Sequence, residues 1–388
     1  MSESAGRALA EFDFQSGPRL VVGPGRLGEL GRLVREFGGS RVLLASDRGL
    51  IETGHVAAAE ESLAKAGVVS LVFSDFDENP SSIAVAAGAA VAREFAPDLL
   101  VGLGGGSSMD CAKGINFLFS CGGRMQDYQG RRTATAPLLP SIGVPTTAGT
   151  GSETQSFALI TDADTGMKMA CGDPAAAFRV AILDVNLTLT QPRSLVALSG
   201  IDAVAHAVES HVSLAASPAS RIFSREAWRL LAAHLPTVLG DDGSLEARAA
   251  VQWAAALAGL AIENSMLGAA HALANPLTAA HGLTHGQAVG LLLPHVVRFN
   301  APAVGGLYAD LLATAGSPTP ESEAADLLAT WLTKLLLAGD LAPTLAVAGI
   351  TPPQIWPLAE LAADQWTARF NPRPVTAADL AALYEAAR

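Results

Sequence analysis

The sequence predicts an α/β part with a mostly parallel sheet and helices on both faces, followed by an all-α part. Two patterns predict this. From about Arg19 to Asp184, short apolar runs rich in β-branched residues alternate with helical stretches, which is typical of consecutive βαβ units. Beyond residue 187, such strand-like runs largely vanish and helical stretches follow one another. We therefore expect two domains, residues 1–188 and residues 189–388.

The elements can be assigned in order along the chain. In the first part we expect strands at 19–23, 41–46, 68–74 and 98–106, each followed by a helix, at 27–38, 55–67, 81–95 and 107–119. In the second part, Pro192 suits a helix start, because its φ is already helical and the first turn needs no amide hydrogen bond there. Helices are then expected at 196–213, 220–235, 245–262, 321–337 and 377–388.

The composition excludes several classes of protein. Half of the 388 residues are apolar and 16% are charged, which is too hydrophobic for a disordered chain and too interrupted by charge for a membrane bundle. The 25 Lys and Arg against 37 Asp and Glu give a net charge of −12, so neither nucleic acid nor a membrane is expected as a primary partner. Three cysteines without a CxxC spacing, and no signal-peptide pattern, predict a cytoplasmic location.

A glycine-rich turn in VGLGGGSSMDCAK predicts a phosphate site. Gly104, Gly105 and Gly106 end a strand and let the backbone approach a ligand, while Ser107 is expected to cap the next helix, whose amides then face a pyrophosphate. The alternative is a turn that only packs a helix against the sheet. Asp47, at the end of RVLLASD, is placed to hold both ribose hydroxyls and to repel a 2′-phosphate, which favours NAD over NADP; the alternative is a helix N-cap.

A second loop and a lysine extend this prediction. SIGVPTTAGTGSET contains small hydroxyl residues and glycines, among them Thr146, Thr147 and Ser152, and a loop so poor in bulky side chains suits a nucleotide. It could equally be an ordinary polar loop. Lys168 offers a charge for a phosphate or a hydrogen bond to the ribose, or it is a solvated lysine.

The histidines indicate a metal site. Seven of the eight lie between residues 206 and 295. Asp202 and His206 are four residues apart, hence on one helix face, and His271 and His285 flank a segment that Pro276 and Gly282 are expected to bend back toward that face. One carboxylate and three imidazoles suit Fe(II) or Zn(II) with a position left open for a substrate oxygen.

Two alternatives stand beside this metal site. An Asp and a His four residues apart are more often a surface pair than a pair of ligands. His281 either competes for the fourth ligand place or relays protons.

Taken in order, VLLASD, GGGSSMDCAK, PTTAGTGSE, GIDAVAHAVE, HAL and THG resemble the iron-containing (group III) alcohol dehydrogenases of the dehydroquinate synthase-like superfamily. The resemblance covers nearly the whole chain. It implies a Rossmann-like N-terminal domain and a helical C-terminal domain, with NAD(P) and the metal meeting between them. It also implies the metal ligands Asp202, His206, His271 and His285, and the cofactor contacts Asp47, Gly105, Gly106, Ser107, Asp110, Thr146, Thr147, Ser152 and Lys168, with Leu187 beside the nicotinamide.

The activity implied by the resemblance is reversible hydride transfer between nicotinamide and a small alcohol or aldehyde, with the metal as Lewis acid. The resemblance also implies a homodimer or higher homo-oligomer, joined through the strand in FDFQSGPRLVVG. Asn275 departs from the family pattern, because many members have a second histidine there, and an amide exchanges no proton near neutral pH. His281 is the candidate to supply the missing imidazole.

Four alternatives remain at this stage. They are a hydroxyacid-oxoacid transhydrogenase, a specialised aldehyde reductase, a synthase that uses NAD transiently, and a non-catalytic scaffold with the same fold.

Overall fold

The computed structural model describes residues 11–131, 134–240 and 244–388. Its first part is built on a six-stranded sheet in the order β1-β9-β6-β4-β2-β3, and every neighbouring pair is parallel, as predicted. The strands are β1 (Arg19–Val22), β2 (Arg41–Ala45), β3 (Val69–Phe73), β4 (Leu99–Gly104), β6 (Ser141–Pro145) and β9 (Val180–Leu183).

Helices cover both faces of this sheet because its central strands are apolar on both sides. Val42 and Leu44 belong to the core formed with α1 (Leu30–Glu36) and α3 (His55–Lys65). Leu43 belongs to the core on the opposite face, under α4 (Ser82–Phe95) and α5 (Gly106–Ser120). This alternation is the two-residue period of a strand.

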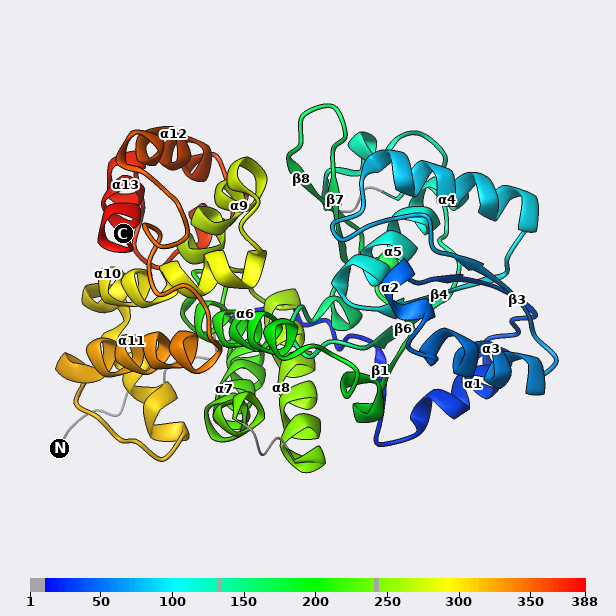
Figure 1. Cartoon of the computed structure of the whole chain (residues 1–388), viewed down its shortest axis with the longest axis horizontal. Helices are drawn as coiled ribbons and strands as arrows, with labels where there is room; N and C mark the ends of the chain where they lie inside the picture. The colour runs from blue at the N-terminus through cyan, green and yellow to red at the C-terminus, as the bar shows by residue number, and fades with distance from the viewer. Residues whose placement is uncertain (1–10, 132–133, 241–243) are drawn as a thin grey trace.

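A second, three-stranded sheet was not predicted from the sequence. It consists of β5 (Gly130–Arg131), β8 (Lys168–Gly172) and β7 (Phe157–Thr161), and β7 and β8 form an antiparallel hairpin. The hairpin lies on the side of the α/β part that faces the helical part (Figure 1). The remaining short segments are α2 (Arg48–Ile51), η1 (Arg26–Glu29), η2 (Met125–Tyr128), η3 (Ser152–Thr154), η4 (Pro174–Ala176), η5 (Val185–Thr188) and η6 (Trp366–Phe370).

The second part is helical, and α6 lies at its centre. This helix packs against α7, α8 and α10, so that most of its length after Leu195 is buried. The helices are α6 (Arg193–Val212), α7 (Pro218–Leu239), α8 (Leu245–Glu263), α9 (Ala269–His281), α10 (His285–Thr314), α11 (Glu321–Ala338), α12 (Pro352–Ala363) and α13 (Ala377–Ala386).

Three of these helices, α9, α10 and α12, were not expected from the sequence. Each contains an internal proline, which reads locally as a break. The predicted bend at Pro276 is wrong, because α9 continues through this proline to His281.

α8 is long and apolar enough to cross a membrane, by length and composition alone. However, 67% of its apolar stretch is buried inside the protein, where α8 packs against α6 and α7. Such burial is typical of a core helix.

The chain passes between the two parts at two places. Residues 11–18 precede β1 but lie on the helical part: the Gln15 amide donates to Asn264 Oδ1 at 2.8 Å, and the Phe14 and Phe223 rings stack with centroids 6.0 Å apart. The second passage lies between η5, which ends at Thr188, and α6. The domain boundary at residue 188 stays a prediction, because the N-terminal segment lies across it.

Candidate metal and cofactor site

Asp202 and His206 lie on the same face of α6, and both are buried. His206 Nε2 is 3.3 Å from Asp202 Oδ1. The other ring nitrogen, Nδ1, lies 3.2 Å from the carbonyl oxygen of Gly149. An Nδ1–H that donates to this carbonyl leaves the Nε2 lone pair directed toward Asp202. This pair is therefore in the core and not on the surface.

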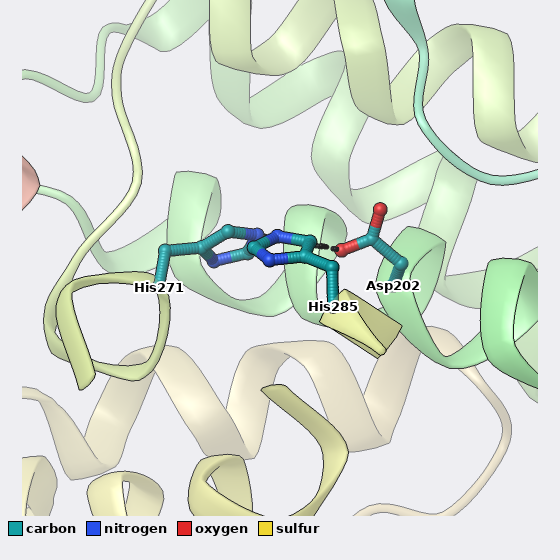
Figure 2. Close-up of side chains that lie close together, drawn as sticks. All are labelled: Asp202, His271 and His285. Carbon is teal, nitrogen blue, oxygen red and sulfur yellow. Dashed lines mark ion pairs between the residues drawn. The ribbon is translucent and has the colours of Figure 1, made fainter. Parts of the chain in front are cut away.

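His271 and His285 reach the same carboxylate from two other helices. Nε2 of His271 is 3.4 Å and Nε2 of His285 is 3.8 Å from Asp202 Oδ1. His271 lies on α9, and His285 is the first residue of α10. Gly282, with φ of +66°, ends α9 and lets the chain turn back, as predicted, so that both rings point at Asp202 (Figure 2).

Glu209 supports this cluster and was missed by the sequence analysis. Its carboxylate accepts hydrogen bonds from His271 Nδ1 and from the amide of Ala270, the latter at 2.7 Å. It fixes the ring of His271 and leaves Nε2 to face Asp202, the arrangement that carboxylates commonly give to metal-ligating histidines. The signal was available, because Glu209 follows Asp202 by seven residues and thus lies on the same face of α6.

The cluster has the charge of a cation site. Burial acts to raise the pKa of Asp202, but the neighbouring histidines outweigh it and hold that pKa below its usual range. Burial lowers the pKa of His285 to about 3. Burial also opposes protonation of His271, but Glu209 and Asp202 outweigh it and raise its pKa to about 9. An ion that binds here must therefore displace a proton from His271.

Unpaired ligand atoms show that these residues fit a divalent metal. Asp202, His271 and His285 each offer one ligand atom, and the three atoms lie within 4.8 Å of one another. Among the described residues, Asp202 Oδ1 and His271 Nε2, which face each other, are buried without a hydrogen-bond partner. His285 Nδ1 also lacks a partner, although the His285 nitrogen nearest Asp202 is Nε2. Such atoms are costly unless a ligand satisfies them. His206 stands beside this set, and its place as a fourth ligand stays a prediction.

His281 and Asn275 lie on the same helix as His271. His281 is half-buried at the end of α9, with Nδ1 3.5 Å from Gln354 Nε2. Asn275 donates from Nδ2 to Gln365 Oε1 at 3.0 Å. The amide at 275 therefore joins α9 to the segment before η6, and the relay role of His281 stays a prediction.

The glycine-rich turn connects β4 to α5, but the predicted helix cap at Ser107 is wrong. Gly104 has φ of +147°, and α5 begins at Gly106 with Gly105, not Ser107, at the N-cap. The Ser107 hydroxyl instead accepts from the amide of Asn79 at 3.0 Å, because the chain enters the helix two residues earlier than the serine would require. The first amides of α5 still lie at the carboxyl end of a central strand, where open α/β sheets bind nucleotides.

The threonine loop packs directly on this turn. A Cβ on Gly105 would lie 3.3 Å from Thr147, and one on Gly106 would lie 2.9 Å from Thr150. The Thr147 hydroxyl is buried without a hydrogen-bond partner among the described residues. Thr146 is held by its amide, which donates to the Gly104 carbonyl at 2.8 Å.

Asp47 is at the N-cap position of α2 but does not cap it. Its Oδ2 accepts from the Ser108 hydroxyl at 3.1 Å. The N-cap alternative is thus wrong for the side chain, and the carboxylate stays beside the glycine-rich turn.

Asp110 and Ser152 bond to each other, the Ser152 hydroxyl donating at 2.7 Å. Lys113, buried beneath them, donates to the carbonyls of Ser152 and Phe157 at 2.7 and 2.8 Å, and burial lowers its pKa to about 8. Sequence reasoning overlooked Lys113, whose ammonium ties α5 to the threonine loop. Asp110 and Ser152 therefore shape the loop, and direct contact with a cofactor stays a prediction for both.

Lys168 and Leu187 were predicted next to the cofactor. Burial lowers the pKa of Lys168, while Asp110, Asp202 and Glu78 act to raise it. The ammonium group of Lys168 therefore interacts electrostatically with Asp110 of α5 and with Asp202 of the candidate metal site. Leu187 is buried on η5 within the core under the sheet, and its contact with the nicotinamide stays a prediction.

Comparison with known proteins agrees with the fold and identifies the family. The family model for iron-containing alcohol dehydrogenases matches residues 17–185. A second family model, for the C-terminal region of Fe-containing alcohol dehydrogenases, matches residues 196–388. The chain is 32% identical over 367 residues to the NAD-dependent methanol dehydrogenase of Bacillus methanolicus, covering 94% of this chain and 96% of that protein. It is 33% identical over 381 residues to the 1,3-propanediol dehydrogenase of Klebsiella pneumoniae, covering 97% and 98%.

Solved structures match over the same extent. A crystal structure of 1,3-propanediol oxidoreductase has a TM-score of 0.94 at 32% identity and covers 98% of this chain and 100% of that one. Sulfoacetaldehyde reductase from Bifidobacterium kashiwanohense, in complex with NAD⁺, has a TM-score of 0.89 at 27% identity, covering 97% and 99%.

Fold, site and relatives together define an oxidoreductase that acts on a CH–OH group. The chain belongs to the iron-containing alcohol dehydrogenase family.

Proposed function

We propose that the protein interconverts a small alcohol and its aldehyde by hydride transfer to and from NAD, with Fe(II) or Zn(II) held by Asp202, His206, His271 and His285. The observation that carries this proposal is the convergence of Asp202, His271 and His285 from three helices, with buried Asp202 Oδ1 and His271 Nε2 lacking other hydrogen-bond partners. The relatives named for methanol and 1,3-propanediol support a small alcohol as substrate.

The residues of the cluster divide the work. When bound, a divalent ion supplies Lewis-acid polarisation of the substrate oxygen. Asp202 contributes the negative charge that offsets part of the charge of the ion, and the imidazoles contribute neutral lone pairs. Glu209 keeps His271 in one orientation. Because Asp202, His206 and His271 are buried, the cluster excludes bulk water from the side opposite the substrate.

NAD is proposed to bind along the glycine-rich turn, with its pyrophosphate at the start of α5 and its ribose at Asp47. The unpaired Thr147 hydroxyl and the position of the first α5 amides at the carboxyl end of a central strand support a ligand at this turn. Lys168, whose charge interacts with both Asp110 and Asp202, is proposed to orient the part of the cofactor nearest the metal. Asp47 favours NAD over NADP.

The protein is proposed to work in the cytoplasm as a homodimer or larger homo-oligomer. β1 supports this, because it is an edge strand of the sheet and leaves backbone groups available to a second copy. Phe12, Phe14 and Val22 are exposed beside it.

Metal analysis combined with an NADH oxidation screen over short-chain aldehydes tests the proposal. We expect stoichiometric Fe(II) or Zn(II) and oxidation of NADH with at least one aldehyde. A protein that captures neither metal and oxidises no NADH would contradict the proposal and favour a scaffold. Hydride exchange between two substrates without net NADH use would favour a transhydrogenase.

A further inference from the structure

A cavity of about 260 Å³ lies at the carboxyl ends of β2 and β3, next to the glycine-rich turn. Arg48, Asp75, Asp77, Glu78 and Asn79 are among its lining residues. The Asn79 amide donates to Ser107 Oγ at 3.0 Å, which ties the wall of the cavity to the first turn of α5. The cavity therefore continues the proposed pyrophosphate site toward the edge of the sheet, where the adenosine half of a dinucleotide belongs.

Acidic side chains outnumber basic ones among the residues that line this cavity. Asp75, Asp77 and Glu78 are acidic, and Asp47 immediately precedes Arg48 in sequence. Arg48 is the one cationic side chain among the lining residues of the described cavity, and its Nη2 is ion-paired with Asp75 Oδ1. The side chains of this pair are 65% and 72% exposed, so a ligand in the cavity can reach them.

Resting on the proposed NAD-dependent function, we propose that Asp75 is a specificity-determining residue for the cofactor. By pairing with Arg48, it withholds the guanidinium from a 2′-phosphate. Asp47 repels that phosphate directly, whereas Asp75 acts by occupying the group that would otherwise attract it. The NAD preference of this chain thus has two separate sources, and one of them can be removed while Asp47 stays in place.

The chemistry of the two cofactors supports this division. NADP differs from NAD by a 2′-phosphate of about −1.5 to −2 charges near neutral pH, which a free arginine binds through two parallel N–H donors. A competing carboxylate on the same guanidinium reduces that binding. Because exposed ion pairs are weak, the release of Arg48 is expected to change binding by no more than about fivefold.

Three variants test the inference, with two adenosine nucleotides as probes. Binding of 2′,5′-ADP and 5′-AMP is measured by calorimetry, and the ratio of kcat/KM for NADPH and NADH is measured alongside. Asp75→Asn should raise the preference for the 2′-phosphate by about two- to fivefold. Asp77→Asn is the matched control, because it removes the same charge from the same cavity without releasing Arg48, and it should change the preference by less than about twofold. Arg48→Ala added to Asp75→Asn should abolish the gain.

Equal effects of Asp75→Asn and Asp77→Asn would overturn the inference, since net charge alone would then explain both. It is also overturned if Arg48→Ala leaves the gain intact. In either case wild-type binding of 5′-AMP and oxidation of NADH would still support the proposed function. A wild type that binds neither nucleotide and oxidises no NADH would remove the proposed function and, with it, this inference.

Discussion

The cluster of Asp202, His206, His271 and His285 lies on long helices, whereas the proposed cofactor site lies on short segments at the carboxyl ends of the strands. Asp202 is near the middle of a 20-residue helix packed on several sides, and a buried carboxylate holds His271. Asp47, Arg48 and Asp75 lie in segments between strands, and the Arg48–Asp75 pair is largely exposed. The difference teaches that the chemistry is placed where side chains cannot move and the choice of cofactor where substitutions disturb little else.

Asp202→Asn is expected to have the largest effect of the substitutions considered, because it changes the residue at the centre of the proposed metal site. The amide keeps the shape of the side chain but removes the negative charge that three histidines face. We expect loss of the metal and a fall in turnover of at least about 10³-fold, because Lewis-acid stabilisation is worth several kcal/mol. Metal content and NADH oxidation measure this. Asp310→Asn is the control, since Asp310 faces another histidine, His211, at 3.5 Å, and it should keep the metal.

Glu209→Gln should weaken metal affinity by about 10- to 100-fold. The side-chain amide of Gln lacks the negative charge that holds His271 Nδ1, although its oxygen can still accept from the Ala270 backbone amide. Competition with a chelator gives the affinity. Glu263→Gln is the comparison variant, because Glu263 is also a buried carboxylate but accepts from Ser156. Equal loss of metal in both variants would contradict a specific role of Glu209.

Gly106→Ala should damage the cofactor region alone. Its Cβ would lie 2.9 Å from Thr150 Cγ2, and relief of this contact pushes the threonine loop away from the turn. We expect the KM for NAD to rise about tenfold, within the cost of a typical overpacking substitution, at unchanged metal content. Gly28→Ala, where a Cβ meets nothing within 4 Å, should have no such effect.

His211 provides a pH-dependent contrast on the same helix as Asp202. Burial lowers the pKa of His211 to about 3 in the folded protein, so between that value and the ordinary value near 6.5 the unfolded chain binds more protons. Its contribution to stability is present above pH 6.5 and is lost at about 1.4 kcal/mol per pH unit as the pH falls toward 3. The free energy of unfolding, measured with urea from pH 7 to pH 4, should therefore fall less with decreasing pH in His211→Gln than in the wild type.

His281→Ala is expected to have the smallest effect, a loss of turnover below about tenfold with one limb of the pH profile displaced, because general acid–base groups act through their own pKa. Steady-state rates from pH 5 to 9 measure it. An unchanged pH profile would reject His281 as the proton relay.

Asn275→His, one helical turn after His271, should add a new titration near 6.5 to the pH profile of turnover if that position faces the reaction.

Sequence reasoning recovered the parts of the molecule that follow from short-range pattern. The parallel strands follow from the alternation of apolar runs with helical stretches, and the shared face of Asp202 and His206 follows from the period of 3.6 residues. The two distant histidines were found because few residue types bind metals. Ser107 was misassigned because the exact start of a helix depends on backbone φ and ψ, which Gly104 and Gly105 set here.

What it missed depends on contacts between distant segments. Glu209 gains its meaning only from His271, 62 residues away, and Lys113 from Ser152, 39 residues away. The prolines in α9 and α10 signal breaks that tertiary packing overrides. The strands of the β7–β8 hairpin alternate in burial but are only five residues long, and so short a run gives a weak signal in the sequence.

The N-terminal segment has a consequence for motion. Because residues 11–18 are anchored on the helical part by Gln15 and Phe14, the two parts are tied together before β1 by these contacts and after η5 by the backbone itself. α8 adds buried hydrogen bonds between the parts: Thr154 Oγ1 donates to the Ala256 carbonyl at 3.2 Å, and Ser156 donates to Glu263. Any wide separation of the two parts would therefore have to break buried hydrogen bonds, which is costly.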